Sequence, residues 1–154
     1  MNVEDLARRL QVLENIEAIK KLKARYCAYC DNNYDADGIA ALFTEEAVWD
    51  GGSFGKYEGR EAIRTFFQGA PKLLTFAIHQ VMNPMIEVQG ETATGKWYLF
   101  QPCTLAEGNQ AAWLAARYEE EYVKVAGEWQ FTQLKVFSSF MTPYEQGWAK
   151  QKFM

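Results

Sequence analysis

The chain has 154 residues, of which 49% are hydrophobic and 23% charged, and it carries a formal net charge of −4 with a pI of about 5.1. This length predicts one domain over residues 1–154, and a chain of this size buries about 68–70% of its unfolded surface, which is enough for a hydrophobic core. The acidic balance argues against a nucleic acid or an anionic membrane as partner, because both require a concentrated basic face.

The first half of the chain has helical periodicity. Apolar residues recur every three or four positions from residue 6 to residue 29, which predicts a long amphipathic helix that ends near Asp31. A second, short helix is expected over residues 35–43, with Asp35 or Asp37 as its N-cap. A short strand over residues 46–50 and a third helix over residues 60–68 follow. The long helix also holds a basic run, interpreted as a solvated face: Lys20, Lys21, Lys23 and Arg25.

The second half changes to β-prone stretches. Four long strands are predicted, at about 75–89, 92–106, 110–125 and 128–141, and each break between them contains a glycine. This spacing predicts consecutive hairpins and therefore an antiparallel sheet. Strands of this length must twist, and Pro84 and Gly95 are the expected sites of bulges. Helices packed in the concavity of such a sheet would give a cone-like α+β roll with an internal pocket.

Three cysteines are present, and two of them have the CxxC spacing of redox and metal motifs, Cys27 and Cys30. They lie inside the predicted helix with no second pair and no nearby histidine, whereas zinc needs about four ligands. We therefore expect reduced thiols, no metal and a cytoplasmic location. The acidic, amphipathic start does not resemble a signal peptide, and no stretch approaches the roughly 18 apolar residues of a membrane span.

The single histidine, His79, is the leading candidate for acid–base chemistry, because imidazole is the side chain that exchanges a proton near neutral pH. Asp31 is the second unusual residue, because the carboxyl end of a helix disfavours a carboxylate. Each residue has a plain structural alternative. His79 lies in an apolar stretch and would fit a core position, and Asp31 precedes two asparagines that are typical of a turn.

Several motifs extend along nearly the whole chain: residues 13–26, Asp31, residues 42–44, 47–49 and 57–63, and His79 before Asn83 and Pro84. In these motifs the chain resembles the SnoaL-like branch of the nuclear transport factor 2-like superfamily. That branch includes scytalone dehydratase, bile-acid 7α-dehydratase and hexachlorocyclohexane dehydrochlorinase. Residues 92–99 are similar to a strand of the bile-acid enzyme, and residues 107–110 and 142–143 are similar to segments of the dehydrochlorinase.

The resemblance implies a cystatin-like α+β fold and a catalytic pair in which Asp31 holds His79. It also implies a cofactor-independent lyase, of dehydratase or dehydrohalogenase type, that acts on a hydrophobic cyclic small molecule. An isomerase or polyketide-cyclase-type enzyme with the same pair, and a non-catalytic small-molecule-binding protein, are the alternatives, since fold does not fix function. A homotrimer is expected by resemblance, with a dimer as second choice.

The resemblance also points to residues around the pair, with departures from the family pattern. Tyr26 stands where the dehydrochlorinase has a helix lysine, and Lys135 is the nearest match to its last-strand arginine. Tyr26 is therefore a candidate hydrogen-bond donor and Lys135 a candidate cation for the leaving group, while Trp49 and Trp97 are candidate pocket walls. Each also has a structural alternative: core for the three aromatic residues, and a solvated or oligomer-facing position for Lys135.

Overall fold

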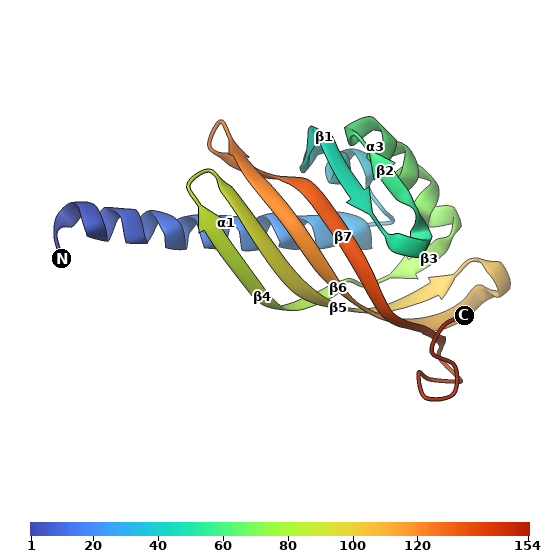
Figure 1. Cartoon of the computed structure of the whole chain (residues 1–154). Coiled ribbons are helices and arrows are strands. Elements are labelled where there is room, and N and C mark those ends of the chain that lie inside the picture. The colour runs from blue at the N-terminus through green and yellow to red at the C-terminus, as the bar shows by residue number, and fades with distance from the viewer.

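The computed structural model describes residues 1–154 and has the predicted α+β architecture, with helices packed against one curved sheet (Figure 1). The helices are α1 (Val3–Asp31), α2 (Ala36–Ala41) and α3 (Arg60–Gly69). The strands are β1 (Phe43–Asp50), β2 (Lys56–Glu58), β3 (Leu74–Ala77), β4 (Gln80–Gln89), β5 (Thr92–Leu105), β6 (Gln110–Val125) and β7 (Glu128–Pro143). Three short 3-10 turns, η1 (Gly52–Phe54), η2 (Ala70–Lys72) and η3 (Glu107–Asn109), join them.

Local capping sets the ends of the first two helices. The Asn2 side chain accepts the backbone N–H of Asp5 and caps the start of α1, which ends at Asp31 as the sequence predicted. The side chain of Asp35 accepts the N–H of Gly38, so Asp35 is the N-cap of α2. This helix is shorter than predicted, because the chain enters strand β1 at Phe43.

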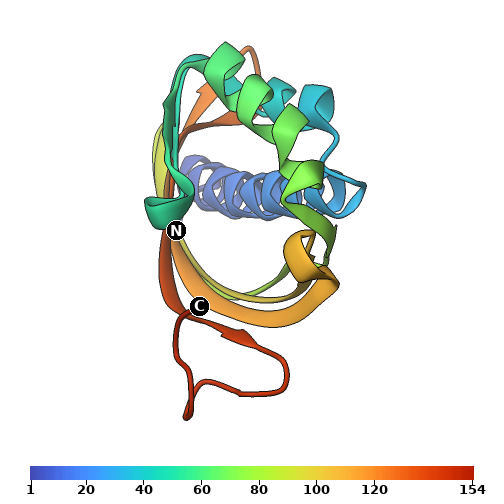
Figure 2. The same cartoon turned by 90° about the vertical axis from the view of Figure 1, so that its right-hand side faces the viewer.

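The sheet has seven strands in the order β2-β1-β7-β6-β5-β3, with β4 also paired to β5. Strands β4 to β7 form the predicted consecutive hairpins, and β1 joins β7 in a parallel pair that the sequence did not predict. Figure 2 shows the sheet curving around α1, with α2 and α3 across the remaining side. The concave face of the sheet therefore encloses α1 and holds the apolar core.

The two expected bulges have different outcomes. The β4–β5 register shifts between Met82 and Met85, which includes Pro84 as predicted. The pairing at Gly95 is regular, so the prediction of a bulge there was wrong. A Cβ atom at Gly95 would lie 2.4 Å from the Tyr122 hydroxyl, so this glycine makes room for a tyrosine instead.

The core contains a buried ion pair between α1 and β6. Lys23 Nζ lies 2.5 Å from Glu120 Oε2, and both side chains are fully buried. The other oxygen of Glu120 accepts the Tyr122 hydroxyl at 2.6 Å, and Lys23 Nζ lies 3.2 Å from the ring centroid of Tyr118. The sequence interpretation of Lys23 as part of a solvated face was wrong. It lies four residues after the buried Ile19, on the core side of α1.

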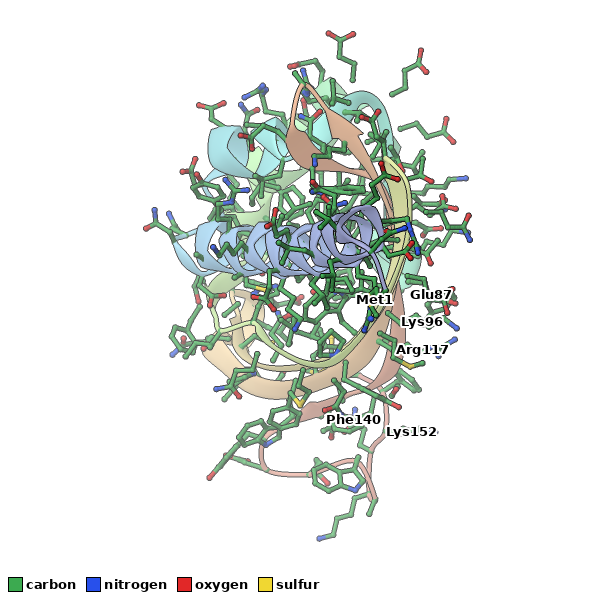
Figure 3. All side chains as sticks on the ribbon, turned by 90° about the vertical axis from the view of Figure 1, so that its left-hand side faces the viewer. Met1, Glu87, Lys96, Arg117, Phe140 and Lys152 are labelled. Carbon is green, nitrogen blue, oxygen red and sulfur yellow. The ribbon has the colours of Figure 1, made fainter.

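The convex face of the sheet carries charged residues and a group of aromatic residues. Figure 3 shows Glu87, Lys96 and Arg117 on the side of the sheet away from the helices. Trp113 is half-buried on this face and stacks on Phe100, with a centroid separation of 5.4 Å. None of the helices is both long and apolar enough to cross a membrane.

Candidate active site

The expected strand over residues 75–89 is interrupted, and His79 lies in the interruption. Strand β3 ends at Ala77 and β4 begins at Gln80, and both pair with the same edge of β5. Pro102 lies opposite the break and accepts the Ile78 N–H at 3.1 Å. Proline has no N–H to continue the ladder towards this edge. The backbone N–H of His79 is bonded by a partner outside the sheet.

Asp31 is that partner, and it contacts His79 twice. Its Oδ1 atom accepts the backbone N–H of His79 at 2.8 Å and lies 2.8 Å from the ring Nδ1 of the same residue. The imidazole is 6% exposed and the Asp31 side chain 30%. The backbone contact fixes where the residue lies and the ring contact fixes how the imidazole is turned. A carboxylate at Nδ1 favours the tautomer with hydrogen on Nδ1, which leaves the Nε2 lone pair free.

His79 lines an apolar cavity of about 60 Å³ between α1, α3 and the sheet. Thirteen of its 15 lining residues are hydrophobic, and the other two are His79 and Gln101. No Asp, Glu, Lys or Arg lines this cavity. The imidazole is therefore the one lining group with a basic nitrogen.

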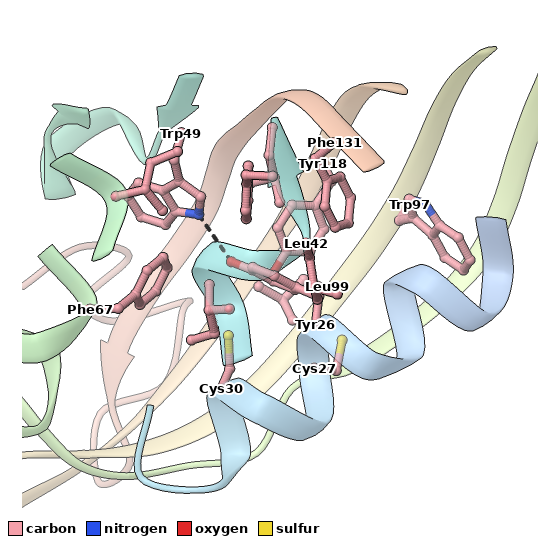
Figure 4. Close-up of a cluster of buried hydrophobic side chains, with 14 of the residues drawn as sticks. Tyr26, Cys27, Cys30, Leu42, Trp49, Phe67, Trp97, Leu99, Tyr118 and Phe131 are labelled. Atoms are coloured by element: carbon pink, nitrogen blue, oxygen red, sulfur yellow. Dashed lines mark hydrogen bonds between the residues drawn. The ribbon is translucent and has the colours of Figure 1, made fainter. Parts of the chain in front are cut away.

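Tyr26 and Trp49 both line the cavity, from α1 and β1 (Figure 4). The Trp49 indole N–H donates to the Tyr26 hydroxyl at 3.0 Å, so the hydroxyl acts as acceptor and keeps its own hydrogen to donate. Burial raises the pKa of Tyr26 well above its ordinary value, and the phenol stays neutral at physiological pH. Tyr26 and Trp49 are also buried core residues, so each packs in the core and lines the cavity from the same position.

Tyr34 is a lining residue that the sequence did not indicate. Its ring stacks on Phe67 at 5.9 Å and meets the imidazole of His79 edge-on at 6.0 Å. Its backbone has φ of +51°, in the turn that follows α1. Burial raises its pKa, so this hydroxyl is also a neutral donor. No periodic pattern includes Tyr34, and only its position three residues after Asp31 could have suggested it.

Two of the predicted site residues do not lie at this cavity. Lys135 lies on the convex face of the sheet, opposite Glu119 in the strand pairing. Trp97 is buried nearer the other end of α1, where its indole N–H donates to the Tyr122 hydroxyl at 3.1 Å (Figure 4). A bulge explains Lys135: Phe131 pairs with Tyr122 but Gln133 with Glu121, so the alternation of β7 reverses after residue 131.

The cysteines and potential metal ligands form no second site. Cys27, Cys30 and Cys103 are free and buried. Burial raises the pKa of Cys27 and of Cys103 to about 11, so these thiols are protonated near neutral pH and are poor nucleophiles. No group of three or more His, Cys, Asp or Glu side chains is arranged to hold a metal ion.

The family model of the SnoaL-like domain matches residues 11–135. Among solved structures, a hexachlorocyclohexane dehydrochlorinase (LinA type 2) is similar at 26% identity and a TM-score of 0.82, over 88% of this chain and 92% of that one. A candidate scytalone dehydratase from Novosphingobium aromaticivorans has 22% identity and a TM-score of 0.78, over 86% and 89% of the two chains. A protein of unknown function from Nostoc punctiforme, described as having a cystatin-like fold, has 24% identity and a TM-score of 0.65, over 78% and 87%.

Proposed function

Because this chain belongs to the SnoaL-like domain family, we propose that it is a cofactor-independent lyase that carries out β-elimination on a hydrophobic cyclic small molecule. The observation that carries the proposal is the 2.8 Å contact between Asp31 and the Nδ1 atom of His79, at the wall of a cavity that is otherwise almost entirely apolar. The likeness to a dehydrochlorinase supports this reaction class.

In this mechanism, Nε2 of His79 removes a proton from a ring carbon of the substrate. The electrons of that C–H bond form a C=C bond, and the leaving group departs from the adjacent carbon with its electron pair. Asp31 holds the Nδ1–H and stabilises the imidazolium that forms, and the proton then passes to solvent. Positioned proton transfer of this kind contributes about 10²–10⁴-fold to a rate.

The departing anion needs hydrogen-bond donors, and the cavity supplies neutral ones. The Tyr26 hydroxyl has a hydrogen to donate, because its contact with Trp49 uses only its oxygen. Tyr34 lies beside the imidazole, and Gln101 adds an amide. Lys135 is not proposed for this role, because it lies on the convex face. The leaving group is thus stabilised by neutral donors in a water-poor site, where hydrogen bonds are strong.

The cavity is small for such a substrate. Small-molecule sites commonly have volumes of about 300–1,000 Å³, whereas this cavity has about 60 Å³. Binding of a ring compound therefore requires side chains at the rim to move. Leu73 is the most exposed lining residue, at 59%, and forms part of that rim.

A second candidate is an isomerase or cyclase that uses the same pair without a leaving group. The observation that favours it is the absence of any Lys or Arg from the cavity wall, since an isomerase releases no anion. A non-catalytic binding protein is the third candidate, because the apolar wall would hold a ring compound without any proton transfer.

One experiment separates the three. Wild type and His79→Ala are incubated in D2O with hexachlorocyclohexane and a panel of alicyclic alcohols and ketones, and the products are analysed by mass spectrometry. The lyase proposal predicts loss of HCl or water from a substrate with wild type and none with the variant. Deuterium uptake at unchanged composition would favour the isomerase. Quenching of tryptophan fluorescence without turnover by either protein would favour the binding protein.

Assembly and location remain predictions. The half-buried aromatic residues on the convex face, such as Trp113 and Phe140, are consistent with a sheet-mediated homotrimer or dimer. A cytoplasmic location is consistent with three free cysteines.

A further inference from the structure

The first turns of α1 project beyond the sheet as a helical arm (Figure 1). Residues 1–14 include no buried side chain, and Asn15 is the first that is buried. The family model begins only at residue 11, so most of this arm lies outside the matched domain. The core thus explains α1 from residue 15 onward but leaves the arm without a packing partner.

The arm carries an apolar stripe that faces solvent. Val3, Leu6, Leu10 and Leu13 are 80%, 54%, 55% and 60% exposed. Their spacing of three, four and three residues is that of the a and d positions of two heptads. A stripe of this kind on a preformed helix is typical of the seam of a coiled coil, and its burial in a partner seam is favourable.

The charged residues beside the stripe favour a second copy of this chain as the partner, with the two helices parallel. With Val3 and Leu10 at a and Leu6 and Leu13 at d, Arg9 occupies a g position and Glu14 the following e position. In a parallel pair, residue g of one helix faces the e residue five positions later in the other, which joins Arg9 to Glu14 in both directions. An antiparallel pair would instead bring the two Arg9 side chains together.

The body of the molecule leaves room for this pairing. The same side of α1 remains exposed further along the helix, at Glu17, Lys21, Ala24 and Ala28, so no other element covers it. Glu17 would occupy the next a position, where two carboxylates would face each other, and the seam therefore ends at Leu13. Because the arm is already helical as a continuation of the buried part of α1, pairing does not require nucleation of a new helix.

We propose that residues 3–13 of α1 are a self-association surface, which pairs with the same segment of a second copy of this chain in a short parallel coiled coil. This interface is separate from the convex face of the sheet and independent of the proposed activity.

The test uses the full chain and two kinds of variant. Leu6→Glu/Leu10→Glu places charges in the seam, and we expect its molar mass by light scattering to be half that of wild type at the same concentration. Arg8→Glu, at the outward f position, is the matched control and keeps the wild-type mass. Circular dichroism shows whether each variant is folded. An equal mass for the double variant and wild type would overturn the proposal.

Cysteine cross-linking tests the direction. Leu6→Cys should form an intermolecular disulfide under mild oxidation, because facing d positions of a parallel pair bring the two Cβ atoms together, whereas Arg8→Cys should not. The native cysteines are buried and give little background. Cross-linking that occurs only in a mixture of Leu6→Cys and Leu10→Cys would show an antiparallel pair and overturn the parallel seam. Arg9→Glu should raise Kd roughly fivefold to tenfold, and Arg9→Glu/Glu14→Arg should restore it.

Discussion

Replacement of Lys23 by methionine tests the energetics of the buried ion pair. Methionine keeps most of the volume of the lysine chain but removes the ammonium group, which lies 2.5 Å from Glu120. Glu120 would remain fully buried with the Tyr122 hydroxyl as its one hydrogen-bond partner. Removing one member of such a pair costs about 3–5 kcal/mol, because the other charge is left without compensation. For a domain of this size that loss corresponds to a fall in Tm of roughly 6–20 °C.

The assay is urea unfolding followed by tryptophan fluorescence, with Lys20→Met as the matched control. Lys20 is exposed and pairs with Glu17 at the surface, so its loss should change the free energy of unfolding by less than about 0.5 kcal/mol. The double variant Lys23→Met/Glu120→Gln removes both charges and should recover a large part of the stability. A loss of less than about 1 kcal/mol in Lys23→Met would refute the reasoning, because it would mean that Glu120 is not held as a buried, paired charge.

Three further predictions concern the core and the candidate site. Gly95→Ala should destabilise the protein by about 1–3 kcal/mol in urea unfolding, because the new methyl group displaces the Tyr122 hydroxyl, and Tyr122→Phe in the same chain should recover part of the loss. Cys27 should resist iodoacetamide in the native protein at mildly alkaline pH, because its pKa of about 11 keeps the thiol protonated below that value. The same thiol should be modified when the protein is unfolded. Rapid labelling of the native protein would contradict the burial of Cys27. Asp31→Ala should lower kcat of any His79-dependent reaction by roughly 10²-fold or more in steady-state assays, and an unchanged kcat would show that the carboxylate does not orient the base.

The elements were predictable where the signal is local. The N-cap at Asp35, the helix end at Asp31 and the glycine-containing turns between the long strands all depend on a few neighbouring residues. The parallel pairing of β1 with β7 was not predicted, because it joins segments about 85 residues apart. Neither segment contains a local sequence pattern that indicates its partner. The split of the first long strand was also missed, although Pro102, opposite Ile78, is a physical reason for it.

The candidate site was predictable in part, and the failures have distinct causes. Asp31 and His79 meet as the resemblance implied, and Tyr26 and Trp49 line the same cavity. Lys135 was chosen as the nearest match to a last-strand arginine, but it lies on the convex face, because a bulge reverses the alternation of β7 after residue 131.

Two residues on the same face of a strand can lie at different distances from a cavity. Trp97 is on the same face as Leu99 and Gln101, which do line the cavity, but it lies further along β5 towards the other end of the cone. Lys23 could have been identified, since it lies four residues after Ile19 and three before Tyr26 on the buried face of α1.

The most direct test of the central claim is the tautomer of His79, read from long-range ¹H–¹⁵N spectra at a pH where the ring is neutral. The chain has one histidine, so the spectrum contains a single imidazole. We predict hydrogen on Nδ1, donated to Asp31, and an unprotonated Nε2 that is free to take a proton from a ligand in the cavity. Asp31→Ala should lose this preference. An Nε2–H tautomer in the wild-type protein would contradict the proposal, because Nε2 would then have no lone pair with which to act as a base.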